Sequence, residues 1–252
     1  MIKGLYASYS AMDSAWKYQN VLANNIANAQ TPGFKRELAS FQAFSDVLIS
    51  QSAPIPAPLA SRIEQVVGTI GTGTFIEEFA TDFARGEIQV TARELDLALD
   101  EGFFAVEGPD ASVFYTTAGQ FGRDANGDRV TGHGYHLLTT EGGHINLPAG
   151  PIIVGADGSI LVSGQPVGQI QIVDFAPANL TRAGDAYFTS TTPGTPVLGG
   201  VRQGLLEMAN SSLLEELTTL LTVQRVFQAN QTILSRLDST LDLAAGQIGT
   251  LR

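Results

Sequence analysis

Apolar residues recur at steps of three and four along the first part of the chain, which is the spacing of one helical face. The positions that define this face are Ile2, Leu5, Tyr9, Met12, Trp16, Ala23 and Ile26. Pro32 and Gly33 end the pattern, because the residue before a proline is pushed out of helical geometry and glycine accepts a left-handed turn. The spacing therefore predicts an amphipathic helix that ends near Gln30.

A second and longer helical pattern occupies the C-terminal part of the chain. Ser212 and Glu215 have the spacing of a capping box, and no glycine or proline follows until Gly246. One apolar stripe consists of Leu213, Leu217, Leu220, Phe227, Leu234 and Leu241, and a second consists of Leu214, Leu221, Val226 and Ile233. The stripes predict a helix of more than thirty residues whose apolar surface a single partner helix would not cover.

The middle of the chain has a different period. Apolar residues alternate with others around Ile88, Leu97 and Ile172, which predicts half-buried β-strands. Turn signals separate these strands at Glu101-Gly102, Asn126-Gly127, Glu141-Gly142-Gly143 and Asp157-Gly158. The segment before them is rich in proline, glycine and small residues, which indicates an extended connector.

These patterns together predict an α+β chain. Long N- and C-terminal helices pair as a coiled-coil-like stalk, and a central all-β domain of short strands lies between them in sequence. The predicted segments are an N-terminal assembly helix over residues 1–35, an extended connector over 36–74, the β domain over 75–204 and a C-terminal assembly helix over 205–252.

Composition and charge narrow the range of functions. Apolar residues make up 44% of the chain and charged residues 15%, so we expect the chain to fold. The formal net charge is −11, and residues 41–204 carry 18 acidic against 7 basic residues, so nucleic acid is not an expected partner.

The chain contains no cysteine. It also has no apolar run typical of a signal peptide or long enough to span a bilayer, so we expect neither a cleaved signal nor direct membrane insertion.

The three histidines of the chain, His133, His136 and His144, lie close together in sequence and raise the question of a metal site. Glycines surround them, and the sequence offers no carboxylate at a matching spacing to orient the rings. We therefore expect no metal site at these residues.

Asp124, Asn126 and Asp128 resemble the start of a calcium-binding loop. Glycine falls at the fourth position of this loop instead of the sixth, and Tyr135 stands where the acid of the twelfth position is required. We interpret Asn126-Gly127 as a hairpin turn instead.

Asp96 and Asp100 come nearest to a pair of catalytic acids. A separation of four residues along a strand places two side chains about 13 Å apart on one face, so we interpret both as solvated strand positions. The chain also lacks the Gly-x-Ser-x-Gly elbow of a nucleophilic serine. We expect no catalytic activity and no cofactor.

Three separated segments of the chain resemble the flagellar axial proteins, which are the rod, hook and hook-junction subunits. Residues 22–35, LANNIANAQTPGFK, resemble the signature of that family. Residues 95–104 (LDLALDEGFF), 115–121 (YTTAGQF) and 123–127 (RDANG) resemble the domain shared by its rod and hook members. Residues 203–210 (QGLLEMAN), with Glu215-Glu216 and Gln224-Arg225, resemble its closing helix. The length and the compact middle domain are similar to those of the FlgF and FlgG rod proteins.

The resemblance implies a structural subunit of the bacterial flagellar basal-body rod, which assembles into a helical tubular axis and transmits torque from motor to hook. It implies as partners further copies of the chain, other rod and hook subunits, and the flagellar type III export apparatus. It places the exported protein in the basal body, in the periplasmic or cell-wall region. A hook or hook-junction subunit is the alternative within the family.

Two alternatives come from other classes of protein. Apolar helical stripes are in general more typical of cores than of polymer contacts, so the chain is alternatively a monomeric β-rich binding module. A metal-dependent enzyme that uses the three histidines is the other alternative.

On the family interpretation, the subunits meet through the two ends of the chain. Asn24, Asn25 and Asn28 share a helical face and offer amides to a packed neighbour, while Pro32, Gly33 and Phe34 fix the exit from the helix. The expected assembly interface consists of Leu5, Tyr9, Met12, Trp16, Asn24, Asn25, Ile26, Asn28, Pro32, Gly33, Phe34, Leu213, Leu217, Leu220, Gln224, Arg225, Phe227, Leu234 and Leu241. Because neighbouring subunits must complete a stalk that is apolar on two faces, we expect the ends of an isolated monomer to be largely disordered.

Overall fold

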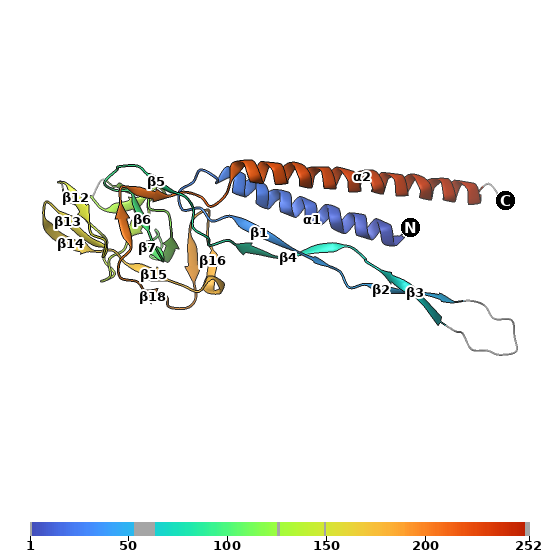
Figure 1. Cartoon of the computed structure of the whole chain (residues 1–252), viewed down its shortest axis with the longest axis horizontal. Coiled ribbons are helices and arrows are strands. Elements are labelled where there is room, and N and C mark those ends of the chain that lie inside the picture. The colour runs from blue at the N-terminus through green and yellow to red at the C-terminus, as the bar shows by residue number, and fades with distance from the viewer. Residues whose placement is uncertain (1, 53–63, 125–126, 149, 250–252) are drawn as a thin grey trace. The chain divides into compact units, whose positions relative to one another are not determined.

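The chain divides into two compact units, which a computed structural model describes over residues 2–52, 64–124, 127–148 and 150–249 (Figure 1). The helical unit comprises Met1–Asn24, Glu37–Ala80 and Glu216–Arg252. The β unit comprises Asn25–Arg36 and Thr81–Glu215. Each unit is therefore assembled from segments that are far apart in the sequence.

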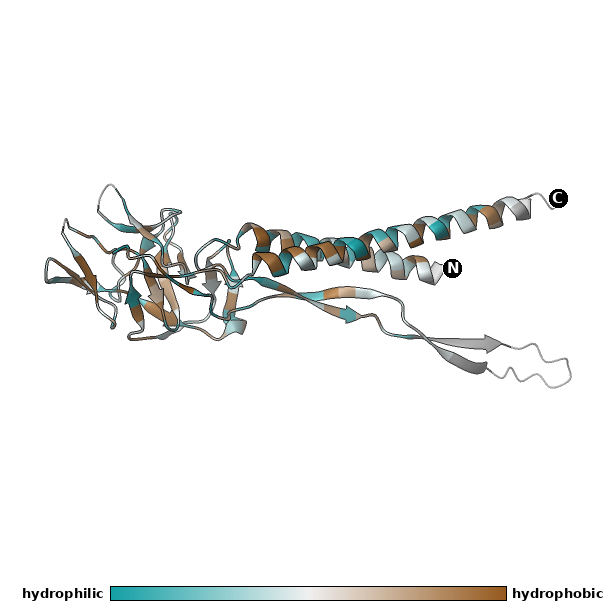
Figure 2. Cartoon of the chain, turned by 45° about the horizontal axis from the view of Figure 1, so that its top comes forward, coloured by the Kyte–Doolittle hydropathy of each residue, from teal (hydrophilic) through white to brown (hydrophobic). Residues whose placement is uncertain are grey.

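The helical unit contains most of two long helices, α1 (Ile2–Ala27) and α2 (Leu213–Gly249). They run side by side in opposite directions in both views (Figures 1 and 2). A β-carbon added to Gly4 would lie 3.8 Å from Cδ1 of Leu237, so the start of α1 faces the later part of α2. The two helices predicted from the sequence are thus confirmed, while their coiled-coil pairing stays a prediction. Neither helix, over its described residues, is long and apolar enough to cross a membrane.

Four strands complete the helical unit. β1 (Glu37–Ala43) pairs with β4 (Thr74–Thr81), and β2 (Val47–Ser52) pairs antiparallel with β3 (Glu64–Ile70). The Ser14 hydroxyl of α1 donates a hydrogen bond to the carbonyl of Thr74 at 3.2 Å, which joins the helix to β4. These strands occupy the segment predicted as an extended connector, although its proline-rich part at 53–63 lies outside the described residues. The predicted domain boundaries stay a prediction.

The β unit is built on a nine-stranded sheet. Its main path runs in the order β16-β17-β8-β7-β11-β10-β9, and β15 pairs with both β7 and β18. These strands are β7 (Phe103–Glu107), β8 (Val113–Thr116), β9 (Phe121–Arg123), β10 (Arg129–Thr131), β11 (His136–Leu137), β15 (Ile172–Asp174), β16 (Leu180–Arg182), β17 (Phe188–Ser190) and β18 (Thr195–Pro196). The central β-rich domain expected from the sequence is confirmed.

Three smaller sheets and one short helix complete the β unit. The order β12-β13-β14 forms one sheet, and the pairs β19-β6 and β20-β5 form the others. The elements are β5 (Ile88–Val90), β6 (Leu97–Leu99), β12 (Ile152–Val154), β13 (Ser159–Val162), β14 (Gln165–Gln169), the 3₁₀ helix η1 (Pro177–Asn179), β19 (Val201–Gln203) and β20 (Leu205–Glu207). The glycines of the predicted turns, Gly102, Gly127, Gly142 and Gly158, all have positive φ.

Strand β7 lies at the centre of the β unit and is buried on both faces. Phe104 and Val106 point into the larger apolar cluster, and Phe103 points into a smaller one with Phe175 and Phe188. Successive residues of a strand point to opposite faces, so one strand contributes to two cores. The sequence predicts half-buried strands here, whereas the described structure covers both sides of this one.

The prediction that Asp96 is a solvated strand position is wrong, although Asp100 is exposed as expected. Asp96 directly precedes β6 and is fully buried. The exposed Arg93 approaches its carboxylate to 4.0 Å. Arg129 is also fully buried; burial lowers the pKa of Arg129 to about 10, and the charge of Asp96 opposes that shift. Alternation cannot reveal this position, because both faces of the segment around β6 are covered.

A buried carboxylate joins the first part of the β unit to its last strand. Glu207, in β20, accepts hydrogen bonds from Nζ of Lys35 at 2.6 Å and from the backbone N–H of Gly86 at 3.1 Å. Its second oxygen accepts from Nη1 of Arg85 at 2.7 Å. Burial lowers the pKa of the Lys35 ammonium, and the Glu207 carboxylate opposes that shift. A buried charge without its partner would cost free energy of folding, so the segments that carry Lys35 and Glu207 must meet in one register.

The turn after α1 is fixed against the same strand. The N–H of Gly33 donates to the carbonyl of Glu207 at 2.8 Å, and its own carbonyl accepts from the Thr117 hydroxyl at 2.9 Å. Phe34 is fully buried, and the guanidinium of Arg182 lies 5.0 Å from the centre of its ring. The side-chain oxygen of Asn210 accepts from the N–H of Arg36 at 2.8 Å. The chain thus leaves α1 along a path that is hydrogen-bonded on several sides.

Replacing Glu207 with Gln is expected to lower the free energy of unfolding of the β unit by about 3–5 kcal/mol, because two cations lose their buried partner. Urea unfolding followed by circular dichroism measures the change. The control is Asp100→Asn, which breaks an exposed pair with Arg202 of 2.5 Å and should cost less than about 1 kcal/mol. Equal effects of the two substitutions would contradict the role given to the buried pair.

Replacing Gly33 with Ala is expected to destabilise the β unit by at least about 3 kcal/mol, since both backbone strain and overlap are introduced. The residue has φ +70°, and an added β-carbon would lie 2.2 Å from the backbone nitrogen of Ala118. Gly134→Ala is the matched control, because Gly134 has φ +81° and open space around it, and should cost about 1 kcal/mol. Thermal unfolding of the two variants tests the difference, and a Gly33→Ala variant as stable as the control would refute it.

Candidate assembly surface

One face of α2 is half-buried in the helical unit. Besides Thr219, the half-buried positions recur at alternating steps of three and four residues, and they are Leu220, Val223, Phe227, Asn230, Leu234, Leu237, Leu241 and Ala244. This heptad spacing is typical of a helix that packs along another helix. Leu220, Phe227, Leu234 and Leu241 of this face belong to the first apolar stripe predicted from the sequence. Val223 and Leu237 are not part of that prediction, although they follow the same spacing.

Other apolar residues of α2 are exposed. Leu214 is 77% exposed and Leu221 is 56% exposed, and these two lie one heptad apart. Val226 and Ile233 form a second exposed pair with the same separation. Leu213 and Leu217 are exposed to a smaller degree, and Gln224 and Arg225 are exposed polar residues. The second apolar stripe seen in the sequence is therefore exposed in the single chain.

The N-terminal helix also carries exposed aromatic residues. Tyr9 is 64% and Trp16 is 56% exposed, and both belong to the expected interface. Tyr6, which the sequence analysis leaves out, is exposed to the same degree as Tyr9. Leu5 and Met12 are half-buried on α1. Large exposed aromatic side chains are enriched where proteins meet other molecules.

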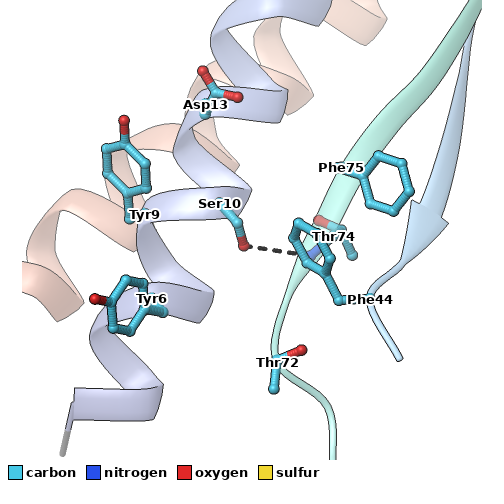
Figure 3. A pocket seen from close by; sticks show the side chains of 8 residues that line it. All are labelled: Tyr6, Tyr9, Ser10, Asp13, Phe44, Thr72, Thr74 and Phe75. Carbon is cyan, nitrogen blue, oxygen red and sulfur yellow. Dashed lines mark hydrogen bonds between the residues drawn. The ribbon is translucent and has the colours of Figure 1, made fainter. Parts of the chain in front are cut away.

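A groove of about 420 Å³ lies beside these aromatic residues, between α1 and the strands of the helical unit (Figure 3). Ser10 and Thr74 lie between the two walls, where the N–H of Thr74 donates to the Ser10 hydroxyl at 3.4 Å. The lining residues are Tyr6, Tyr9, Ser10, Asp13, Phe44, Thr72, Thr74 and Phe75. Phe44 and Phe75 pack with ring centres 4.8 Å apart, so this groove is mainly apolar and aromatic.

The remaining residues of the expected interface belong to the end of α1 and its turn. Asn24 is exposed, Asn25 is buried, and Ile26, Asn28 and Pro32 are half-buried. Gly33 and Phe34 are buried inside the β unit, where they hold the turn described above. These two residues have no surface to offer to another subunit, so any effect that they have on assembly is exerted through the path of the chain.

The three histidines separate into two places in the β unit. Nδ1 of His133 lies 3.2 Å from the Tyr187 hydroxyl. The rings of His136 and His144 stack with centres 4.4 Å apart, and one oxygen of Asp128 lies within 4.8 Å of a nitrogen of each ring. The carboxylates near these rings come from neighbouring paired segments, so the spacing of residues along the sequence does not predict them.

Comparison with protein families finds three matches in the same order as the segments above. Residues 5–35 match the family model described as flagella basal body rod protein. Residues 100–162 match the D1 domain of the flagellar hook proteins FlgE/F/G, and residues 202–246 match the C-terminal region of the flagellar basal body rod FlgEFG proteins.

Curated relatives match the chain over nearly its whole length. The flagellar basal-body rod protein FlgG of Bacillus subtilis is 32% identical, over 96% of this chain and 97% of that protein. The flagellar hook-basal body complex protein FlhO of the same organism is 29% identical over the full length of both chains. The flagellar basal-body rod protein FlgF of Caulobacter vibrioides is 29% identical, over 100% of this chain and 98% of that protein.

Proposed function

The chain belongs to the family of flagellar basal-body rod proteins, and on that premise we infer that it is a structural subunit of the rod, a self-assembling part of the motility apparatus. The observation that carries this inference is the similarity to FlgG over 96% of the chain, together with the family matches over residues 5–35 and 202–246, which contain most of α1 and α2. A structural role also agrees with the apolar, aromatic character of the groove and the exposed helical faces.

In this proposal the half-buried seam of α2 holds the helical unit together, and the exposed stripe contacts neighbouring subunits. Leu221 and Ile233 are each about half exposed and would be buried by a packed helix of another subunit. Full burial of a leucine or isoleucine side chain contributes about 1.5–3 kcal/mol, so a few such residues suffice for a stable contact. In the proposal this stripe meets the aromatic surface of α1 on a neighbouring subunit, a heterologous contact, which forms an open helical polymer when its rotation does not close a ring.

The aromatic groove supplies the complementary surface in the same proposal. Tyr6, Tyr9 and Trp16 project from α1, and Phe44 and Phe75 form the opposite side of the groove. Aromatic side chains bury a large area with few rotatable bonds, which makes them effective anchors of an interface. The partners are further copies of this chain and other rod and hook subunits.

The protein's route and location follow from the same family membership. Its site of action is the flagellar basal body. In the proposal, the flagellar type III apparatus exports the subunit, and the subunit acts in the periplasmic or cell-wall region. Catalysis has no part in this role.

Replacing Leu221 with Asp is expected to prevent incorporation into the rod, because a charge would have to be buried at the subunit contact. Motility of cells that carry only this variant, together with its presence in isolated basal bodies, measures the effect. The free protein should unfold at the same temperature as wild type, since Leu221 is exposed in the single chain. Normal motility would refute the assignment of the exposed stripe.

Two further variants accompany this test. Leu221→Met keeps an apolar side chain of similar volume and should leave motility intact. Leu220→Asp places the charge on the half-buried seam and should also block incorporation, while the β unit of the free protein stays folded. Normal incorporation of Leu220→Asp would show that the seam does not hold the helical unit together in the rod.

Hydrogen exchange of the dilute protein tests whether the ends of the chain depend on their neighbours. Amides of β7 are expected to be strongly protected, because this strand is buried on both faces, whereas residues 213–241 should exchange rapidly. Light scattering establishes that the sample is monomeric. Strong protection of residues 213–241 in that monomer would show that the helices are stable without neighbours.

A further inference from the structure

Strand pairing brings two histidines and two carboxylates together beside strands β7, β11 and β10 of the β unit. His136 in β11 lies directly opposite Glu107 in β7. His144 is bridged to Leu138, two residues after His136, and Asp128 is bridged to Asn146, two residues after His144. Residues two apart along a strand share a face, so the four side chains lie on the same face of these paired segments.

Three of these residues have possible metal-ligand atoms close to one another. One nitrogen of His136, one nitrogen of His144 and one oxygen of Asp128 lie within 4.8 Å of one another. Nδ1 of His136 is buried without a hydrogen-bond partner among the described residues. A buried, unpartnered nitrogen normally carries a penalty that a bound cation would remove.

The fourth residue, Glu107, has a different part in the arrangement. Its carboxylate lies 2.7 Å from Nε2 of His144. A carboxylate on one nitrogen of an imidazole fixes the ring and its tautomer, and leaves the other nitrogen, Nδ1, as the metal ligand. Glu107, His144 and the ion would then form a carboxylate–histidine–zinc arrangement, which is common around protein-bound zinc.

We propose that Asp128, His136 and His144 form a binding site for a Zn²⁺ ion, with Glu107 as the residue that positions His144. Two imidazole nitrogens and one carboxylate oxygen match the donor preference of Zn²⁺, whereas Mg²⁺ and Ca²⁺ prefer oxygen ligands throughout. Bonds of about 2.0–2.2 Å require the donors to approach to about 3.3 Å, which is within reach of side-chain rotation. Three protein ligands leave a fourth position for water or for a group from another molecule.

The ion would tie the loop that carries His144 to β10 and β11. That loop is already attached through the N–H of Arg129, which donates to the carbonyl of Ile145 at 3.0 Å, and through the N–H of Leu147, which donates to the carbonyl of Gly127 at 2.8 Å. An ion bound by His144, Asp128 and His136 adds a cross-link between segments whose backbones are already hydrogen-bonded to each other. The site lies within the β unit, so the inference does not rest on the proposed role in the rod.

Titration of the full-length chain with Zn²⁺ tests the site, using protein without a polyhistidine tag that has been stripped with a chelator. Isothermal titration calorimetry or competition with a chromogenic chelator measures affinity and stoichiometry. We expect one Zn²⁺ ion per chain, at least tenfold weaker binding for His144→Ala and for Asp128→Asn, and a 10- to 100-fold loss for Glu107→Gln. Absence of stoichiometric binding by the wild-type chain would overturn the proposal.

His133→Ala is the matched control, because His133 is a neighbouring histidine that contacts Tyr187 and lies apart from the stacked rings. It should bind Zn²⁺ as the wild type does, and a loss equal to that of His144→Ala would overturn the assignment. Circular dichroism checks that each variant is folded, and His144→Gln replaces His144→Ala if the latter is not. At one fixed concentration, Zn²⁺ should raise the unfolding temperature of the wild type and of His133→Ala more than that of the other variants. If Mg²⁺ displaces Zn²⁺ from the protein at equal concentration, the site is one that prefers oxygen ligands, and this result would also refute the proposal.

Discussion

The ion pair between Lys35 and Glu207 is the contact on which the rest of the β unit depends. Both side chains are about 1% exposed, so neither charge can be solvated by water if its partner is displaced. A buried pair of this kind contributes little to net stability, because the cost of desolvation offsets most of the attraction. The pair instead contributes to the specificity of the fold. In the observed arrangement of the turn after α1 and strand β20, the two charges pair with each other, and the backbone of Gly33 and the amide of Asn210 also form hydrogen bonds.

This contact also gives a physical reason for two of the segments that resemble the flagellar family. Lys35 is the last residue of the first segment, and Glu207 and Asn210 belong to the last one. The two segments meet in the folded chain, where Gly33 and Phe34 complete the same cluster. The segments therefore encode the closure of one unit, while the residues that remain exposed on α1 and α2 are available for contacts between subunits.

The features that could be predicted from the sequence are those with local signals. Periodicity predicts α1 and α2 because helical contacts repeat every three or four residues, and glycine marks the turns because a positive φ is a property of one residue. Asp96 is buried, contrary to the prediction, because other strands cover both faces of the segment around β6. The carboxylates beside the histidines cannot be predicted for a similar reason, since their position depends on the register of β7, β10 and β11, which the pattern along one strand does not contain.

The separation of Lys35 and Glu207 by 172 positions has a consequence for the order of folding. Loop closure over such a distance is slow, and it requires that both segments be present. While the chain emerges from its N-terminus, the Lys35 ammonium therefore has no carboxylate partner until Glu207 has appeared. The junction between the turn after α1 and β20 is thus late to close by topology alone, whereas all strands of the nine-stranded sheet precede β20 in the sequence.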